Sequence, residues 1–532
     1  MLEEAFPHGV SGDMSLTLRF LLGAFFLLCG ALPIHAASDK PLERGAAIID
    51  PLALRELDRG RFGLGRILEP ARSADTPLTN AELFAMPSLA PVKAASDAEF
   101  GRYVARHKAE LPDETIGVGE AFAFQLFDRA LLTSADTRFV LAGIVNRMDR
   151  TFVAEKSCGE IRLIYRLVRT NLPAGAETAS RLPMTLNVVL RAKGEPAVDR
   201  DGKPITCAVI AERWLATADL SLTGRDLAAK LQAKGGPLDL VMAENIDRIE
   251  TNLQIAHAPK SAKRDFRTDY LLKLFRYDGK TRLFAEATLE NQIDRERILA
   301  DAGLARDFKA WLLDPAHFSE LDRGTILIPE KFLAKAAIAP TPVGFAPSSL
   351  LPEFGLSEGE GSHAVFSESD VVDALKKAGS DGTALQNIRS FGGFQRRLND
   401  ITCAGCHQTR GIGGFHFPGV DWMTAKPSNS TVVPASPHFF GDQPRRRDIL
   451  AALRDGRPPD YSKSFASRPQ LRGEKELAGT EYSDGWGAHC YQTTRASRDN
   501  DASFRAWTCA KGLACQTADK ATRMGMCFVK AH

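Results

Sequence analysis

The chain has 532 residues, more than a single hydrophobic core usually holds, so its length predicts two or more structural units. Hydrophobic residues make up 44% and charged residues 25%, which argues against a wholly disordered, a collagenous or a polytopic membrane protein. The formal net charge of +2 gives no global electrostatic reason to expect nucleic acid as a partner.

The N-terminal stretch predicts a secretory leader. An apolar run over residues 20–32 follows Arg19 and precedes small residues. It is shorter than the ~20 apolar residues of a bilayer span, and a basic residue, a short apolar run and small residues at a cleavage site are typical of a signal peptide. We expect cleavage after Ala36 or Ala37. Because three acidic residues precede Met14, we expect Met14 to be the true start.

A leader at residues 1–36 predicts a periplasmic or secreted protein in an oxidising compartment. The alternatives are an uncleaved membrane anchor and a lipoprotein anchored at Cys29. No second long apolar segment occurs, so we expect no transmembrane anchor in the mature chain. Removal of the leader takes away one Arg and three acidic residues and leaves a net charge of +4.

The part of the chain before residue 340 is predicted to be rich in strands. After a leading segment at residues 37–137, with a short helix at 52–59, a β-rich domain is expected at residues 138–340. Its predicted strands are 139–145, 161–168, 184–190 and 207–214, with a hairpin of 270–277 and 281–288. Its predicted helices are 227–231, 246–253 and 295–313.

The part after residue 340 is predicted to be mainly helical. A Pro- and Gly-rich linker at 341–361 marks our expected domain boundary. A haem-binding region at 362–470 and a disulfide-rich tail at 471–532 follow. Helices are predicted at 371–377, 384–398 and 444–454. The predicted fold class is therefore α+β.

Eight cysteines are expected to remain after export. Cys158 and Cys207 adjoin predicted strands of one region and predict a disulfide, with two buried free thiols as the alternative. The tail has four cysteines within a short segment, which predicts two disulfides with three possible connectivities. These tail cysteines are Cys490, Cys509, Cys515 and Cys527.

The remaining two cysteines form Cys-x-x-Cys-His at residues 403–407, the pattern of covalent haem c attachment. The spacing lets both thiols reach the vinyl groups on one porphyrin edge, and His407 then lies where its imidazole can bind iron as the proximal ligand. Two alternatives are a disulfide between Cys403 and Cys406, as in thioredoxin-type motifs, and a zinc site that would need His416 or His438.

With this motif, the chain resembles the c-type cytochromes over roughly residues 384–455. The resemblance implies one covalent haem c, held by Cys403 and Cys406 with His407 on the iron, in a small helical fold. It also implies one-electron transfer with a redox partner protein, whose identity is unknown. It says nothing of residues 38–340.

The sixth haem ligand has several candidates. Met423 is a possible thioether ligand, although it lies only sixteen residues after His407. His416 and His438 sit among aromatic residues and are the imidazole alternatives, and an open iron site would admit peroxide or gas. Residues 445–447 are three arginines that could pair with haem propionates or an acidic partner, but a solvated helix start is the interpretation we favour.

These observations predict an exported mono-haem c-type electron-transfer protein. One alternative is a haem-dependent oxidoreductase or peroxidase with a substrate site in the N-terminal region, although a single Cys-x-x-Cys-His disfavours the di-haem peroxidases. Another is an exported binding protein in which Cys-x-x-Cys is a structural disulfide. The chain lacks the P-loop, GxGxxG, nucleophile-elbow and HExxH motifs of other enzyme classes.

Overall fold

The computed structural model describes residues 44–73, 77–154, 156–170, 181–193, 197–199, 201–257, 267–342, 365–408, 437–465, 468, 484–485, 488–493, 500–517 and 523–529. These residues combine helices with antiparallel strands, which confirms the mixed α+β class, and they belong to one compact unit. The predicted leader lies outside the described residues.

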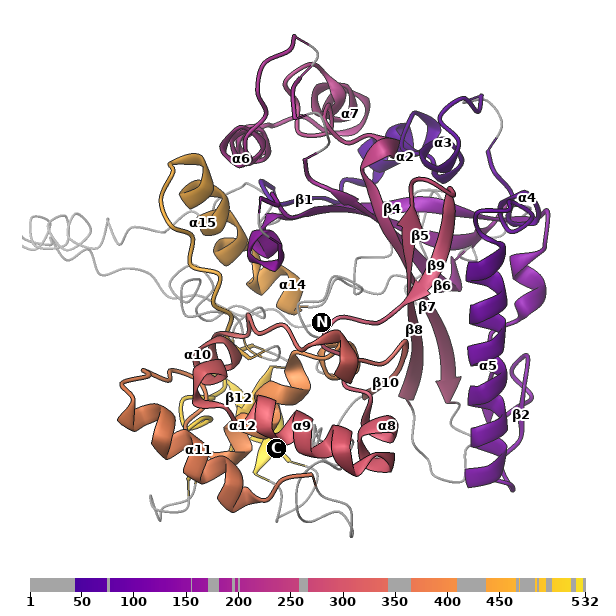
Figure 1. The fold of residues 1–532 in the computed structure, drawn as a ribbon. Coiled ribbons are helices and arrows are strands. Elements are labelled where there is room, and N and C mark those ends of the chain that lie inside the picture. Colours follow the sequence, from indigo (N-terminus) through magenta and orange to yellow (C-terminus); the bar gives the residue numbers. More distant parts are fainter. Residues whose placement is uncertain are drawn as a thin grey trace, which may run out of the picture. The chain divides into compact units, whose positions relative to one another are not determined.

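A ten-stranded sheet dominates the part of the chain before residue 343. Its strands are β1 (Ala47–Ile48), β2 (Ile116–Gly117), β3 (Phe124–Gln125), β4 (Thr137–Arg147), β5 (Glu160–Arg169), β6 (Arg181–Arg191), β7 (Ile246–His257), β8 (Arg267–Asp278), β9 (Leu283–Ala287) and β10 (Ala336–Pro342). Strands β4 to β8 pair antiparallel in sequence order (Figure 1), and β1 extends the sheet beyond β4. β8 also pairs with β9 and β10, and β3 pairs with the end of β7 and with β2. The predicted strands at 139–145, 161–168 and 184–190 and the hairpin of β8 and β9 are confirmed.

Helices from both sides of the predicted boundary at residue 137 cover this sheet. They are α2 (Pro51–Arg59), α3 (Leu64–Leu68), α4 (Asn80–Leu83), α5 (Ala90–Glu110), α6 (Cys207–Leu215) and α7 (Gly224–Gln232). One hydrophobic core joins them to the strands, and the long helix α5 lies along β8 and β9 (Figure 1). The hydroxyl of Tyr165 in β5 donates to the carbonyl of Phe62 at 2.8 Å, and both residues are buried. The described part of the predicted leading segment at 37–137 thus contributes apolar side chains to the core of the sheet.

Two segments were assigned to the wrong type of element. Residues 207–214, predicted as a strand, form α6, where Thr206 caps the first turn and Ile210, Ala211 and Trp214 face the core at helical spacing. Residues 246–253, predicted as a helix, lie in β7. Pairing with β6 on one side and β8 on the other decides this segment, since tertiary context overrides local propensity.

A second hydrophobic core is built from helices on both sides of the predicted linker. These helices are α8 (Arg295–Ala300), α9 (Ala302–Leu312), α10 (Pro315–Arg323), α11 (Glu368–Ser380) and α12 (Phe391–Asp400). Phe318 of α10 stacks with Phe394 of α12 at a centroid distance of 5.8 Å, and both belong to this core. The predicted boundary at 341–361 therefore does not separate two cores. Residues 343–364 lie outside the described residues.

Hydrogen bonds to aspartate and serine side chains explain why the predicted helices at 295–313 and 384–398 are shorter in the structure. Asp301 accepts hydrogen bonds from the N–H groups of Gly303 and Leu304, so it starts α9 and divides the predicted helix 295–313. Residues 386–388 donate their backbone N–H groups to the carboxylate of Asp322. The predicted helix 384–398 consequently begins only after Ser390, which caps α12.

Three disulfides brace the chain. Cys158 is bonded to Cys207, the pair that the sequence predicts, and this bond ties the start of α6 to the sheet. In the tail, β11 (His489–Tyr491), β12 (Leu513–Gln516) and β13 (Met524–Val529) form a small antiparallel sheet. Of the three possible connectivities, the structure has Cys490–Cys515 and Cys509–Cys527.

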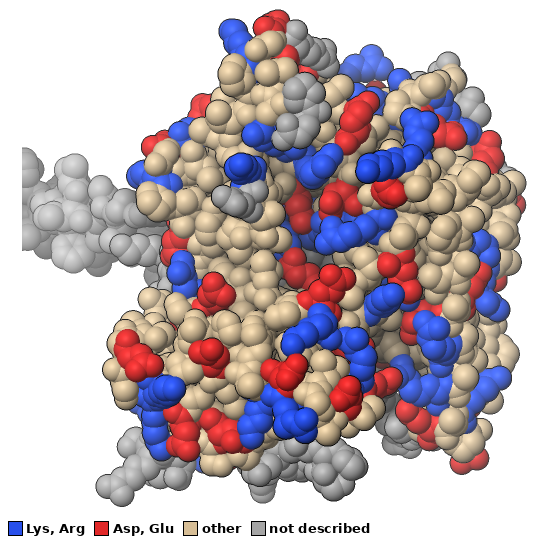
Figure 2. Space-filling view, in the orientation of Figure 1, with Lys and Arg blue, Asp and Glu red and all other residues tan. Residues whose placement is uncertain are grey.

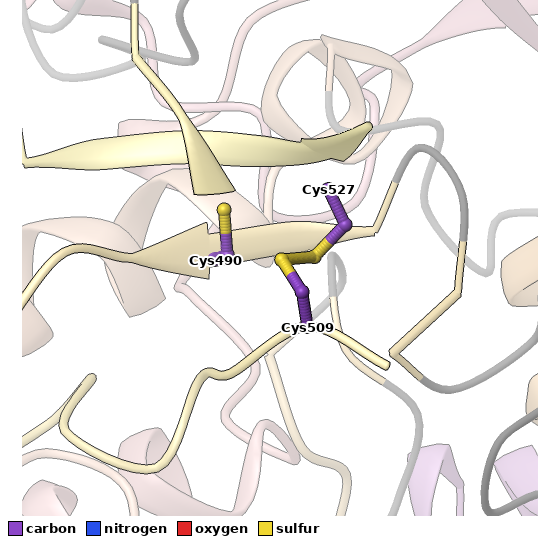
Figure 3. Close-up of side chains that lie close together, drawn as sticks. All are labelled: Cys490, Cys509 and Cys527. Atoms are coloured by element: carbon purple, nitrogen blue, oxygen red, sulfur yellow. A yellow bond between two sulfur atoms is a disulfide. The ribbon is translucent and has the colours of Figure 1, made fainter. Parts of the chain in front are cut away.

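The tail sulfurs lie close enough together to resemble a metal cluster. Figure 3 shows Cys490 beside the bonded pair Cys509 and Cys527, and the sulfur atoms of the three residues lie within 4.8 Å of one another. All three are engaged in disulfides, so they offer no thiolate to a metal. Disulfides of this kind are typical of oxidising compartments. Among the described residues, no helix has the length and apolarity needed to cross a membrane.

Candidate functional site

The Cys-x-x-Cys-His segment forms a short helix, α13 (Cys403–Gln408), directly after α12. Thr402 stands between the two helices, and its hydroxyl accepts a hydrogen bond from the N–H of Gly405 at 2.9 Å and donates one to the carbonyl of Asn399 at 2.7 Å. A Cβ atom on Gly405 would overlap that same carbonyl. Only glycine therefore lets α13 turn so closely against the end of α12.

The two cysteines of α13 form no disulfide, so both carry thiols. They are three residues apart, which places them on neighbouring positions of one helical turn. The N–H of Ala404 donates to the Gln292 side chain at 3.0 Å, and the Cys403 sulfur lies 3.7 Å from the carbonyl of Glu290. Burial raises the pKa of the Cys403 thiol, so it stays protonated at neutral pH.

Both thiols line a cavity of about 800 Å³. This volume falls in the range of about 300–1,000 Å³ that is usual for small-molecule and cofactor sites. The walls come from distant parts of the chain: β5, β7 and β8 of the large sheet, residues 288–291, residues 324–328, the end of α12 and residues 463–464. The large sheet and the Cys-x-x-Cys-His segment therefore line the same cavity.

Basic side chains on the cavity wall outnumber acidic ones by five. Eleven basic side chains face it: Arg147, Arg150, Lys156, Arg162, Arg191, Lys193, Arg248, Lys273, Arg276, Arg397 and Lys463. Six acidic side chains oppose them: Glu160, Asp247, Glu250, Glu290, Glu330 and Asp400. On the outer surface shown in Figure 2, by contrast, Lys and Arg are interspersed with Asp and Glu.

Part of this charge is held in a buried ionic cluster on the sheet. Glu160 pairs with Arg150 at 3.3 Å, Arg162 at 3.1 Å and Arg248 at 2.9 Å. Burial opposes ionisation of Glu160, but the three guanidinium groups hold the pKa of its carboxyl well below the usual value. Arg150 also binds Glu290 in a bidentate pair, and the pKa of Glu290 falls to about 2 against the opposing effect of burial. These carboxylates therefore stay ionised.

Lys463 differs from these paired charges. Its side chain lines the cavity without a hydrogen bond or ion pair to any described residue, and its ammonium lies 5.9 Å from the ring centre of Phe152. Burial is the main cause that lowers the pKa of Lys463 to about 7; Asp149 raises it, whereas Arg445 and Arg147 lower it.

The arginines at residues 445–447 begin α15 (Gln443–Arg454), but not as a solvated helix start. Arg445 and Arg446 are buried, with 0% and 2% exposure. Arg445 donates to Asp442 at 2.6 Å and to Asp149 at 2.8 Å, and Arg446 donates to Asp442 at 2.7 Å. The solvated interpretation is wrong for these two residues, because both bind the buried Asp442 at the start of α15 and Arg445 also ties this helix to Asp149 in the turn after β4.

The other predicted haem ligands are outside the described side chains. His407 lies in α13 and His438 in α14 (Pro437–Gly441), but only their backbones are described. His416 and Met423 fall in residues 409–436, outside the described residues.

Sequence reasoning missed the charged cavity wall. Glu160 and Arg162, and likewise Arg248 and Glu250, are two residues apart and so point to the same face of their strands. Opposite charges two residues apart within apolar strands are the signal that identifies these wall residues, although the local pattern of residues 246–253 favours a helix.

Comparisons with known proteins found no matching family model, no matching curated protein and no matching solved structure.

Proposed function

We propose that this chain is an exported mono-haem c-type protein that transfers single electrons to or from a partner protein. Cys403 and Cys406 would each form a thioether with the haem, and His407 would bind the iron. The observation that carries the proposal is that the motif's two cysteines form no disulfide and line one cavity of cofactor size.

The state of the cysteines supports this proposal over a plain disulfide. The other six cysteines of the described chain are bonded in pairs, whereas Cys403 and Cys406 are not. Thioether formation adds each S–H across a vinyl group and needs no oxidant, so neutral thiols such as that of Cys403 are a suitable starting state. Haem, when bound, supplies a one-electron Fe(III)/Fe(II) couple.

The cavity charge also fits this cofactor. A haem brings two carboxylates into its site, and the excess of basic over acidic side chains on the wall favours such an anion. The apolar neighbours of Cys403, which include Leu272, Leu274 and Leu289, offer contacts to a porphyrin edge. The residues present therefore fit the cofactor in charge, size and attachment chemistry.

Expression with a haem c maturation system tests the proposal. The purified chain is denatured, separated by electrophoresis and stained for haem, and the pyridine haemochrome spectrum is recorded. We expect covalent haem in the wild type, a spectrum with one vinyl group retained in Cys403→Ser or Cys406→Ser, and none bound in the double variant. Cys158→Ser is the matched control and should keep both thioethers. Absence of covalent haem from the wild type would refute the proposal.

A haem-dependent oxidoreductase is a second candidate, because the large sheet contributes β5, β7 and β8 to the wall of the same cavity. A high-spin ferric spectrum with peroxide turnover would favour the oxidoreductase, and a low-spin spectrum without turnover would favour the carrier.

The sixth ligand is identified by single replacements in the haem-loaded protein. Met423→Ala, His416→Ala and His438→Ala are compared by visible spectroscopy. Only loss of the true ligand should change the spectrum, and three unchanged low-spin spectra would exclude all three candidates.

A further inference from the structure

We propose that Lys463 forms an anion-binding subsite in this cavity, where its ammonium holds a carboxylate of the bound ligand. The carboxylate could belong to a haem propionate, in which case the inference rests on the proposed function, or to a small carboxylic acid that serves as substrate.

The first argument is that hydrogen bonds to its backbone hold Lys463 in position. The guanidinium of Arg397, in the helix that leads into the Cys-x-x-Cys-His segment, donates to the carbonyl groups of Lys463 at 3.0 Å and Ser464 at 2.9 Å. The N–H of Lys463 donates to the carbonyl of Arg323 at 2.8 Å. Arg397 is itself buried and also donates to the carbonyl of Asp322. The segment is thus clamped where its lysine faces the cavity that contains the thiols.

The second argument is the missing partner. The cavity's Glu160, Glu250 and Glu290 are already paired with arginines, and no described residue pairs with the Lys463 side chain. Lys463 is half-buried, and the fall of its pKa to about 7 reflects the cost of partly desolvating an ammonium that has no carboxylate beside it. A ligand carboxylate would supply the missing charge and raise the pKa of the ammonium again.

The third argument is the sign of the local field. The charged groups around Lys463 are Arg147, Asp149 and Arg150 from β4 and the turn after it, Arg445 from α15, and Asp400 with Arg397 from α12. Cations outnumber the two carboxylates, and Asp149 is already bound by Arg147 and Arg445. This field attracts an anion and repels a second cation.

The arginines at the start of α15, which the sequence offered as propionate partners, do not compete for this role. Arg445 and Arg446 are engaged with Asp442 and Asp149. Lys463 lies nearby and forms no ion pair with any described residue.

The test is a redox titration of the haem-loaded protein from pH 5.5 to 9, with Lys463→Gln, Lys463→Arg and the control Lys230→Gln, which removes an exposed charge of α7 that does not line the cavity. If Lys463 holds a propionate, the wild-type midpoint potential falls as the pH rises through the lysine's titration above 7, because a lost positive charge near haem disfavours the reduced state. Lys463→Arg should keep the higher midpoint potential at every pH, and Lys463→Gln should keep the lower one. Lys230→Gln should follow the wild type.

A second arm tests the substrate source with succinate as the probe in calorimetry at pH 6.5. If the subsite takes a free carboxylate, succinate binds to the wild type and to Lys463→Arg, and roughly ten- to a hundredfold more weakly to Lys463→Gln. Potentials that coincide in all variants, together with succinate binding that is absent or unaffected by Lys463→Gln, would overturn the inference. If no haem attaches, the proposed function fails, and the succinate arm still tests the subsite on the haem-free chain. Thermal unfolding of each variant establishes that it is folded.

Discussion

Replacement of Arg445 offers a direct test of how α15 is held in place. Its guanidinium makes three hydrogen bonds to two buried carboxylates, at 2.6 and 2.9 Å to Asp442 and at 2.8 Å to Asp149. Both carboxyl groups and the guanidinium have at most 1% side-chain exposure. Arg445→Ala would therefore leave two buried anions short of a cation.

The expected cost follows from these contacts. Removal of one partner from a buried ion pair typically lowers the free energy of unfolding by about 3–5 kcal/mol. The remaining cations, Arg446 on Asp442 and Arg147 on Asp149, prevent a larger loss. We expect Arg445→Lys to lose part of this amount, because one ammonium does not reproduce the fork that spans both carboxylates.

The loss should depend on pH in a defined direction. Burial alone would raise the pKa values of Asp149 and Asp442, but the neighbouring arginines keep both below the usual value. Their stabilising effect is present above the unfolded-state pKa of about 4 and is lost as pH falls through the lower folded-state values. The gap between wild type and Arg445→Ala should therefore be widest near pH 7 and narrow below about pH 4.

Urea unfolding followed by circular dichroism at pH 7 and pH 3.5 measures both effects. Arg323→Ala is the matched control, since Arg323 is 49% exposed and forms only a 3.8 Å pair with Asp460. Its loss should stay below about 1 kcal/mol. If Arg445→Ala costs no more than this control at pH 7, the buried pair does not fasten α15.

Three further substitutions probe the supports of the site. Replacing both Cys158 and Cys207 by Ser opens a disulfide of sequence separation 49 and should lower the free energy of unfolding by about 4 kcal/mol in urea titrations; an unchanged midpoint would contradict the bracing role. Gly405→Ala places a Cβ against the carbonyl of Asn399, so we expect the free energy of unfolding to fall by about 1–3 kcal/mol and haem staining to show a smaller haem-loaded fraction. Normal haem loading would show that α13 tolerates the added methyl group. Asp322→Ala leaves three backbone N–H groups before α12 without their acceptor and should cost at least about 3 kcal/mol by thermal or urea unfolding, with Asp322→Asn less affected; equal stability of all three proteins would show that water replaces the carboxylate.

Local sequence patterns correctly predicted the helices and strands that are determined by their own residues. Strands β4, β5 and β6 are apolar runs rich in Val, Ile and Leu, and helices α2 and α11 carry clear capping residues, Asp50 and Ser367. These patterns gave wrong predictions where a contact with residues distant in the sequence determines the secondary structure. Pairing with β6 and β8 makes residues 246–253 a strand, and the Asp322 carboxylate keeps residues 386–388 out of a helix.

The same division applies to the candidate site. Cys-x-x-Cys-His is five contiguous residues, so its attachment chemistry can be inferred from the sequence alone. The cavity that the motif opens into cannot, because its wall combines strand residues near 160, 250 and 273 with Lys463 and with the motif at residue 403. Only the folded chain brings these charges together, since each lies more than 50 residues from the motif and is placed by sheet pairing or by the hydrogen bonds of Arg397.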